Sequence, residues 1–150
     1  MAAIKEWFGL YNVIFNWIEN KYGYSALEDY WEFIAKSCCE EAVEKVSRDG
    51  LEGIKQYYEH TFDLDQAGYS SKYEEGNLVF EISKCPDYEF MNSSGNVHFK
   101  PVKNYCRHHE VINNFIAEQC GLSFSMPHCG NHGTCRWVFG KKLEEGRDKL

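Results

Sequence analysis

The spacing of apolar residues changes once along this chain, near Gly76, and that change limits the folds the chain can adopt. Before Gly76, apolar side chains recur every three or four residues, which is the period of an amphipathic helix. After it, Leu78, Phe80 and Ile82 alternate with the residues between them, as in a strand. The sequence therefore predicts a helical first part followed by a part that contains strands.

Three helices are predicted in the first part. The first covers about residues 4–22 and ends at Gly23, since glycine favours the position after a helix. The second extends from about residue 25 to 47, and the third from about residue 49 to 62. Residues 63–76 are rich in glycine and serine, so we expect a polar surface connector there.

The second part predicts strands with one helix among them. Strands are expected around residues 78–83, 97–99, 122–126 and 135–139, and a helix from about Tyr105 to Gln119. Strands joined by short turns pair antiparallel. The predicted class is α+β, with N-terminal helices followed by a small antiparallel sheet and one long helix packed across it. At 150 residues we expect a single domain, with a helical part at about 1–62 and a Cys/His-rich α+β part at about 77–140.

The charge and the cysteine content restrict the class of function. The formal net charge is -7, and neither nucleic acid nor an anionic membrane binds well to an acidic surface. The apolar run from Leu10 to Ile18 is too short to span a bilayer and has no signal-peptidase pattern, so a cytoplasmic location is expected. In that compartment, seven cysteines indicate metal or redox chemistry more than a disulfide framework.

Aromatic residues form 16% of the chain, which predicts a Tyr/Phe/Trp-rich core and allows an apolar pocket for a small-molecule ligand or substrate. On the first helix, Leu10, Val13 and Trp17 add apolar surface to the side away from the main stripe. This helix is therefore either deeply buried or part of a homodimer contact made by the N-terminal helices.

Two clusters of cysteine and histidine suggest one metal site. Cys106 and His109 are three residues apart at a predicted helix start, so their side chains share one face. Cys129 and Cys135 lie at the two ends of a glycine-containing loop, which allows their thiols to converge. Three cysteines and a histidine make a tetrahedral set suited to zinc.

Other ligands remain possible at this site. His128 and His132, in the loop, are alternative nitrogen ligands. Cys85 is a further thiol, and its addition to the three cysteines would supply four thiolates, enough for an iron–sulfur cluster. An iron–sulfur or redox protein is therefore an alternative to a zinc protein.

Candidate catalytic residues lie next to these ligands. His108, Glu110 and His132 could carry protons in a metal-assisted hydrolysis. Arg136 alternates with Cys135 along its strand and could meet the carboxylate of a substrate. The chain contains no nucleophile–histidine–acid pattern and no phosphate-binding glycine loop.

The segment from Cys106 to Lys142 resembles a known family. A cysteine followed by a helix, then Cys129-Gly130 and the run Cys135-Arg136-Trp137-Val138-Phe139-Gly140-Lys141, is similar to the 4-vinyl reductase-type domain and to L-2-amino-thiazoline-4-carboxylic acid hydrolase-like proteins. The hydrolase-like proteins also have a Cys-Pro after a strand, as at Cys85-Pro86.

The resemblance implies a zinc ion bound by cysteines beside a pocket for a small molecule, with Cys106 and Cys135 at matching positions and Cys129 at an approximate one. The family pattern also has a glutamate and a cysteine before the hairpin loop, where this chain has Ser123-Phe124-Ser125-Met126. The resemblance implies hydrolysis of a C–N bond in a small, cyclic acid. A small-molecule sensor with a structural zinc is the alternative that it also allows.

Overall fold

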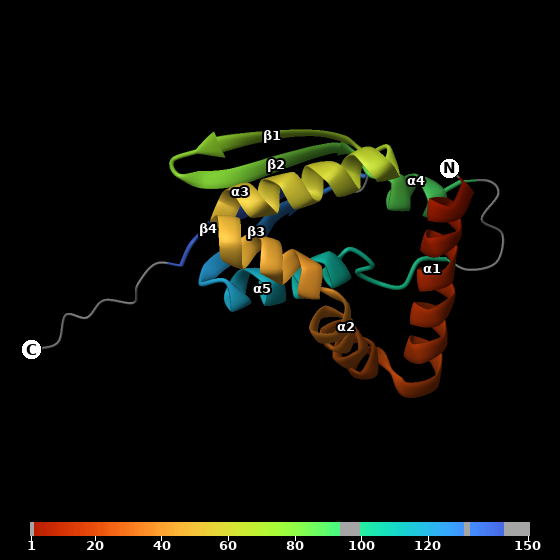
Figure 1. Cartoon of the computed structure of the whole chain (residues 1–150). Helices are drawn as coiled ribbons and strands as arrows, with labels where there is room; N and C mark the ends of the chain where they lie inside the picture. Colours follow the sequence, from red (N-terminus) through yellow and green to blue (C-terminus); the bar gives the residue numbers. More distant parts are fainter. Residues whose placement is uncertain (1, 94–99, 131–132, 143–150) are drawn as a thin grey trace, which may run out of the picture.

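The structure is a computed structural model that describes residues 2–93, 100–130 and 133–142, with side chains from residue 6 onward. Its elements, in chain order, are α1 (Ala2–Tyr22), α2 (Tyr24–Cys38), α3 (Glu40–Asp65), β1 (Gly68–Glu74), β2 (Asn77–Lys84), α4 (Pro86–Met91), α5 (Arg107–Gln119), β3 (Leu122–Cys129) and β4 (Cys135–Lys141). The predicted α+β class is confirmed: three N-terminal helices precede an antiparallel sheet on which a further helix packs (Figure 1).

The four described strands pair in the order β1-β2-β4-β3, with antiparallel neighbours throughout. Alternation places Phe80 of β2, Phe139 of β4 and Phe124 of β3 on one face of the sheet, where all three are buried. Helices α3 and α5 cover this face and contribute Tyr58 and Ile116 to the same hydrophobic cluster. The sheet and these two helices therefore form one packed layer pair.

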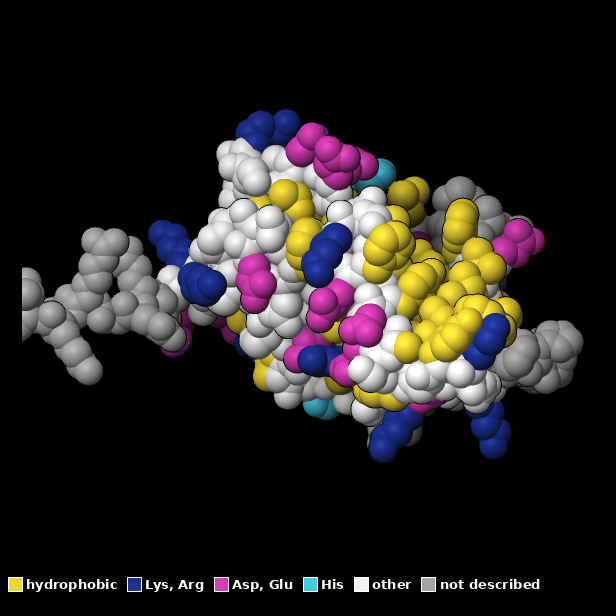
Figure 2. Space-filling model, turned by 90° about the horizontal axis from the view of Figure 1, so that it is seen from below, with side chains coloured by type: hydrophobic (Ala, Val, Ile, Leu, Met, Phe, Trp, Pro, Cys, Tyr) yellow, Lys and Arg dark blue, Asp and Glu magenta, His cyan; other side chains and the backbone are white. Residues whose placement is uncertain are grey.

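A second hydrophobic cluster joins α1 and α2 to the segment that precedes α5. Phe15 and Trp31 are almost completely buried, and their rings pack edge to face with centroids 5.5 Å apart. Val102 and Tyr105 complete this cluster from the chain before α5. The opposite side of α1 is exposed, and Figure 2 shows apolar side chains gathered on the side of the molecule where α1 lies.

The helix boundaries differ from those predicted. The break between the second and third helices falls at Cys39, and not near residue 48. Helix α3 then continues through Gly50, whose φ of 60° and ψ of −135° produce a kink near the predicted boundary. Glycine reaches this positive φ without the steric cost that a Cβ brings.

The predicted polar connector at residues 63–76 was wrong. The chain forms β1 between Gly68 and Glu74, an edge strand paired with β2. None of the residues in β1 is fully buried, so the apolar alternation that reveals most strands is weak there. Residues 97–99, where a short strand was predicted, lie outside the described residues.

None of the described helices is long and apolar enough to cross a membrane.

Candidate metal centre

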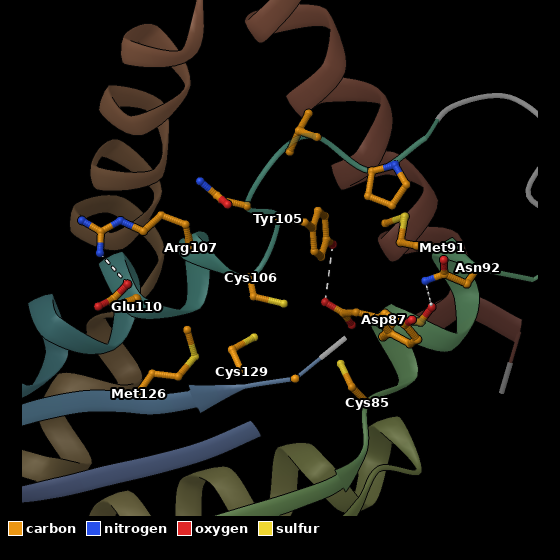
Figure 3. Close-up of a pocket in the computed structure, with 15 residues that line it drawn as sticks. Cys85, Asp87, Met91, Asn92, Tyr105, Cys106, Arg107, Glu110, Met126 and Cys129 are labelled. Atoms are coloured by element: carbon orange, nitrogen blue, oxygen red, sulfur yellow. Dashed lines mark hydrogen bonds and ion pairs between the residues drawn. The ribbon is translucent and has the colours of Figure 1, made fainter. Parts of the chain in front are cut away.

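The candidate site lies between the two hydrophobic clusters, at the start of α4 and α5 and at the ends of β3 and β4. A cavity of about 620 Å³ opens there. Its wall includes Cys85, Asp87, Met91, Tyr105, Cys106 and Cys129. Figure 3 shows Cys106 and Cys129 on one side of the cavity, with Cys85 and Asp87 facing them.

Three thiols, which we call the thiol trio, meet in this region: Cys106, Cys129 and Cys135. Cys106 directly precedes α5, Cys129 ends β3, and Cys135 begins β4. The Sγ atoms of Cys129 and Cys135 are 3.3 Å apart, and these two residues are cross-strand partners. Cys106 lines the same cavity as Cys129, and interaction with Cys129 and Cys135 raises the pKa of its thiol, which indicates that it lies near both. The structure thus brings together three of the cysteines that the sequence singled out.

The mutual hydrogen bonds of the thiol trio distribute its protons unequally. Hydrogen bonds from Cys106 and Cys135 lower the pKa of Cys129 to about 3. Interaction with Cys129 and Cys135 raises the pKa of Cys106. Contact with Cys106 lowers the pKa of Cys135. The hydrogen bond that Cys135 donates to Cys129 and burial have the opposite and larger effect, so the pKa of Cys135 rises to about 12. One thiolate is therefore stabilised at neutral pH, and thiolate is the form that binds metals.

The loop between β3 and β4 holds the two strand-end thiols close together. The Gly130 backbone N–H donates to the Thr134 carbonyl at 2.6 Å, which continues the strand pairing beyond Cys129 and Cys135. A Cβ on Gly130 would lie 2.5 Å from the Thr134 hydroxyl oxygen. Gly133, at a φ of 72°, packs against the ring of Tyr88. At Gly130, any larger residue would displace the Thr134 and His128 side chains, and at Gly133 the backbone conformation favours glycine.

Cys85 is the fourth thiol near the cavity. It directly precedes α4 and faces the side of the cavity where Cys106 and Cys129 lie (Figure 3). Burial raises the pKa of the Cys85 thiol to about 12, and the nearby Asp87 carboxylate raises it as well. Cys85 is therefore protonated at neutral pH unless a cation approaches it.

A second group of ligand atoms, which we call the histidine–aspartate cluster, consists of Asp87, His108 and His109. One ligand atom from each residue lies within 4.8 Å of the other two. Asp87 belongs to the first turn of α4, and the histidines belong to the first turn of α5. The two imidazole rings have centroids 3.9 Å apart, and His109 Nε2 is 3.8 Å from Asp87 Oδ2.

The histidine–aspartate cluster is mostly buried. Asp87 and His108 expose 8% and 5% of their surface, while the His109 side chain keeps 27%. Burial raises the pKa of Asp87 to about 7 and lowers the pKa of His108 to about 4. Burial, and then the neighbouring His108, hold the pKa of His109 well below its ordinary value. Each group thus favours its neutral form, as expected where charge is poorly solvated.

The other residues singled out from the sequence have varied surroundings. His109, expected to join the thiols, groups with Asp87 and His108. Glu110 lines the cavity but forms an ion pair with Arg107. His128 Nε2 is 3.4 Å from the Thr134 hydroxyl oxygen. His132 lies outside the described residues.

Arg136, expected to meet a substrate carboxylate, forms ion pairs with Glu81 and Glu74 within the protein. Glu81 is its cross-strand partner on β2, and Glu74 ends β1. The guanidinium group is therefore already occupied by two carboxylates on the sheet.

The sequence interpretation missed Asp87 and the helix that carries it. Strand β2 ends before Cys85-Pro86, as the sequence indicated. A helix start was missed there: proline is common in the first turn of a helix, and the acidic Asp87 and Glu89 favour a helix N-terminus. These signals together could have predicted α4. The contact of Asp87 with residues 21 and 22 positions later depends on tertiary packing, which no local pattern reveals.

Comparisons of this chain with models of protein families, with curated proteins and with solved structures found no match.

Proposed function

We propose that this protein binds a zinc ion through the thiol trio and a small molecule in the adjoining cavity. The observation that carries this proposal is the meeting of three thiols from separate segments at the edge of a cavity of about 620 Å³. Cysteine sulfur is a preferred zinc ligand, and three protein ligands leave one coordination position open. Interaction with Cys106 and Cys135 lowers the pKa of Cys129, which favours the thiolate form that binds metal.

The cavity favours a small, partly apolar ligand. Met91, Met126 and Tyr105 contribute to its wall, and thioether and aromatic surfaces adapt to varied ligand shapes. Asp87 and Glu110 add carboxyl groups, while Arg107 adds one guanidinium group. Such a wall suits a small molecule that has both an apolar ring and polar substituents.

The reaction that fits best is hydrolysis of a C–N bond in a small acid. It requires a zinc ion with one coordination position open to water or substrate. Zinc in such a site polarises a carbonyl-like bond or lowers the pKa of water. Among the predicted proton carriers that the structure describes, Glu110 is the one on the cavity wall. We propose that Glu110 accepts a proton during hydrolysis and that Arg107 orients its carboxylate through their ion pair. The motif resemblance to hydrolase-like proteins supports the same reaction.

A sensor-type domain with a structural zinc is the second candidate. The ion pair between Glu110 and Arg107 favours it, because this contact already occupies the carboxylate that hydrolysis would need as a proton acceptor. An iron–sulfur cluster would instead need Cys85 as a fourth thiolate, and Cys85 does lie on the same cavity wall.

Metal analysis of protein purified without oxygen tests the proposal. We expect one zinc per chain in the parent, and less than about a tenth of that in Cys106→Ser and Cys135→Ser, which each remove one ligand. Cys38→Ser is the matched control, because Cys38 is an exposed thiol at the end of α2, and it should keep its zinc.

Three results would contradict zinc binding by the thiol trio: a parent free of metal, a Cys106→Ser variant that keeps full zinc, or visible absorption with iron and sulfide in place of zinc. To separate the two zinc-based candidates, cyclic acids containing a C–N bond are incubated with the parent and with Glu110→Gln. Product formed only by the parent supports the hydrolase, and binding without product supports the sensor.

A further inference from the structure

We propose that the histidine–aspartate cluster of Asp87, His108 and His109 is a second metal site, which takes a divalent first-row transition ion with open coordination positions. Two histidines and one carboxylate form a ligand set that binds such ions on one face and leaves the other positions free. The proposal depends on residues different from the thiol trio, so it stands independently of zinc binding there.

The three ligand atoms are close enough to bind one ion after a small movement. They lie within 4.8 Å of one another. Ligands at 2.0–2.2 Å from a metal are separated by about 3–3.5 Å, so each side chain has to approach by roughly an ångström or less. Adjacent residues of a helix usually point about 100° apart. Here the two imidazole rings are brought together, with centroids 3.9 Å apart.

A backbone hydrogen bond already orients His108 as a metal ligand. Its Nδ1 lies 2.6 Å from the Tyr105 carbonyl oxygen, which can only accept, so Nδ1 carries the proton. Nε2 is then the unprotonated ring nitrogen, the form that binds a metal. Metal-binding histidines commonly have this second hydrogen bond, which fixes both the tautomer and the ring orientation.

The Asp87 carboxylate has little to balance its charge. It accepts a hydrogen bond from the Tyr105 hydroxyl at 3.4 Å, and within the described part of the chain its ion-pair partner is His109 at 3.8 Å. A buried carboxylate is costly without a cation, and a bound divalent ion would compensate it.

The chemistry of the second site differs from that of the thiol trio. Thiolates prefer zinc and iron–sulfur clusters, whereas imidazole and carboxylate ligands suit iron(II) and also accept manganese(II). Asp87 lies on the cavity wall, so the open positions of the ion would be reached from the cavity. A small acid that presents two oxygen atoms could occupy them together. We therefore infer that the ligand class of the second site is a chelating carboxylic acid.

Titration of the purified, zinc-containing protein with Mn²⁺, followed by electron paramagnetic resonance, tests the second site. Mn²⁺ binds poorly to thiolates, so it distinguishes the two ligand sets. We expect one Mn²⁺ per chain in the parent and binding weaker by at least about tenfold in Asp87→Asn and His109→Gln. Glu89→Gln is the matched control, because Glu89 is an exposed carboxylate on the same helix as Asp87, and its affinity should not change.

The Cys106→Ser variant decides whether the two sites are separate. If it keeps the Mn²⁺ affinity of the parent, the second site is independent of the thiols. Loss of Mn²⁺ in this folded variant would overturn the proposal, as would absence of Mn²⁺ binding by the parent or unchanged binding by Asp87→Asn. Circular dichroism of each metal-free variant establishes folding, and Asp87→Asn preserves the shape of the side chain if His109→Gln unfolds.

Discussion

The thiol trio and the histidine–aspartate cluster are built by neighbouring residues, yet they differ in burial and in chemistry. Cys106 is separated from His108 by one residue, and Cys85 from Asp87 by one residue. Cys129 of the trio is exposed, whereas Asp87 and His108 are buried. In the trio, the Cys135 thiol donates a hydrogen bond to Cys129, whereas the buried Asp87 carboxyl group lies beside the imidazoles of His108 and His109.

The two sites illustrate two ways in which a fold can hold metal-ligand atoms in the absence of a metal: exposed to solvent or buried. An accessible set of thiols can share a negative charge and is open to oxidation. A buried set of ligands is not solvated, so its unfavourable desolvation energy lowers the stability of the metal-free protein. The three predictions below test this contrast, beginning with the largest expected effect.

Mild oxidation should disable the thiol trio and leave the histidine–aspartate cluster intact. Because Gly130 and Thr134 form the hydrogen-bonded pair, the adjacent pair Cys129 and Cys135 is the non-hydrogen-bonded one, with Cα atoms about 4.5 Å apart. That spacing allows a disulfide. Diamide should therefore take two electrons and two protons from these thiols, form one S–S bond and reduce zinc binding to less than about a tenth.

Peptide mapping and metal titration of the oxidised protein check this prediction. Mn²⁺ binding should remain as in the reduced protein. The control is Cys38→Ser, which should form the same disulfide, while Cys135→Ser should form none. A disulfide between other cysteines, or zinc binding that survives oxidation, would contradict the geometry assigned to the trio.

Asp87→Asn should stabilise the metal-free protein at alkaline pH. The folded-state pKa of Asp87, about 7, is above its unfolded value, so the favourable contribution is complete below pH 4 and is lost as the pH rises to about 7. Each pKa unit corresponds to about 1.4 kcal/mol, so the variant should gain about 2–4 kcal/mol at pH 8 after loss of one hydrogen bond.

Urea unfolding in the presence of a chelator, at pH 5 and pH 8, measures this gain. By contrast, Cys129→Ser should change stability by less than about 0.5 kcal/mol, because the residue is exposed. Equal pH dependence in the parent and in Asp87→Asn would show that the carboxyl group is solvated in the folded protein.

Much of the fold was predictable because periodicity reports burial. The N-terminal helix and the strands containing Phe80, Phe124 and Trp137 have clear apolar patterns, and each of these side chains is buried. Strand β1 lacks such a pattern because it is an edge strand with no fully buried residue. The break at Cys39 has no proline or glycine to mark it, and the glycine at position 50 produced a kink and not an end.

The candidate site was predictable in part. Cysteines at a helix start and at the two ends of a short loop suggested a meeting point, and the structure places those thiols together. Their role as zinc ligands remains a prediction. The pairing of Asp87 with His108 and His109 depends on how α4 packs against the start of α5. The three-residue spacing from Cys106 assigned His109 to the thiols, because spacing along one helix cannot show which neighbouring cluster a side chain joins.

Substitutions on the exposed surface of α1 are expected to have the smallest effect on metal binding by either ligand set. We propose that this surface faces a second copy of the chain. Trp7, Leu10, Val13 and Trp17 expose between 43% and 56% of their surface, and large exposed apolar patches mark contact sites. Glu6 and Lys21 lie exposed near opposite ends of the helix, so an antiparallel second copy would pair unlike charges.

Analytical ultracentrifugation checks this arrangement. Trp17→Ser should weaken self-association by at least about tenfold, since tryptophans dominate many interfaces, and should leave zinc and Mn²⁺ binding unchanged. Phe33→Ser is the control, because Phe33 is 64% exposed on α2. A parent that sediments as a monomer at all concentrations would remove this proposal and leave the comparison of the two metal sites untouched.

The adjacent rings of His108 and His109 face different parts of the molecule, and this gives the protein two optical reporters. The His108 ring centroid lies 6.3 Å from that of Trp31, in the helical cluster, and the His109 ring centroid lies 5.4 Å from that of Trp137, in the sheet. In a single copy of the chain, Trp7 and Trp17 are exposed to an aqueous quencher, whereas Trp31 and Trp137 are buried. With iodide suppressing the exposed pair, the remaining emission belongs to two indoles that each lie beside one imidazole. Tryptophan fluorescence therefore follows the environment of both histidines without any added label.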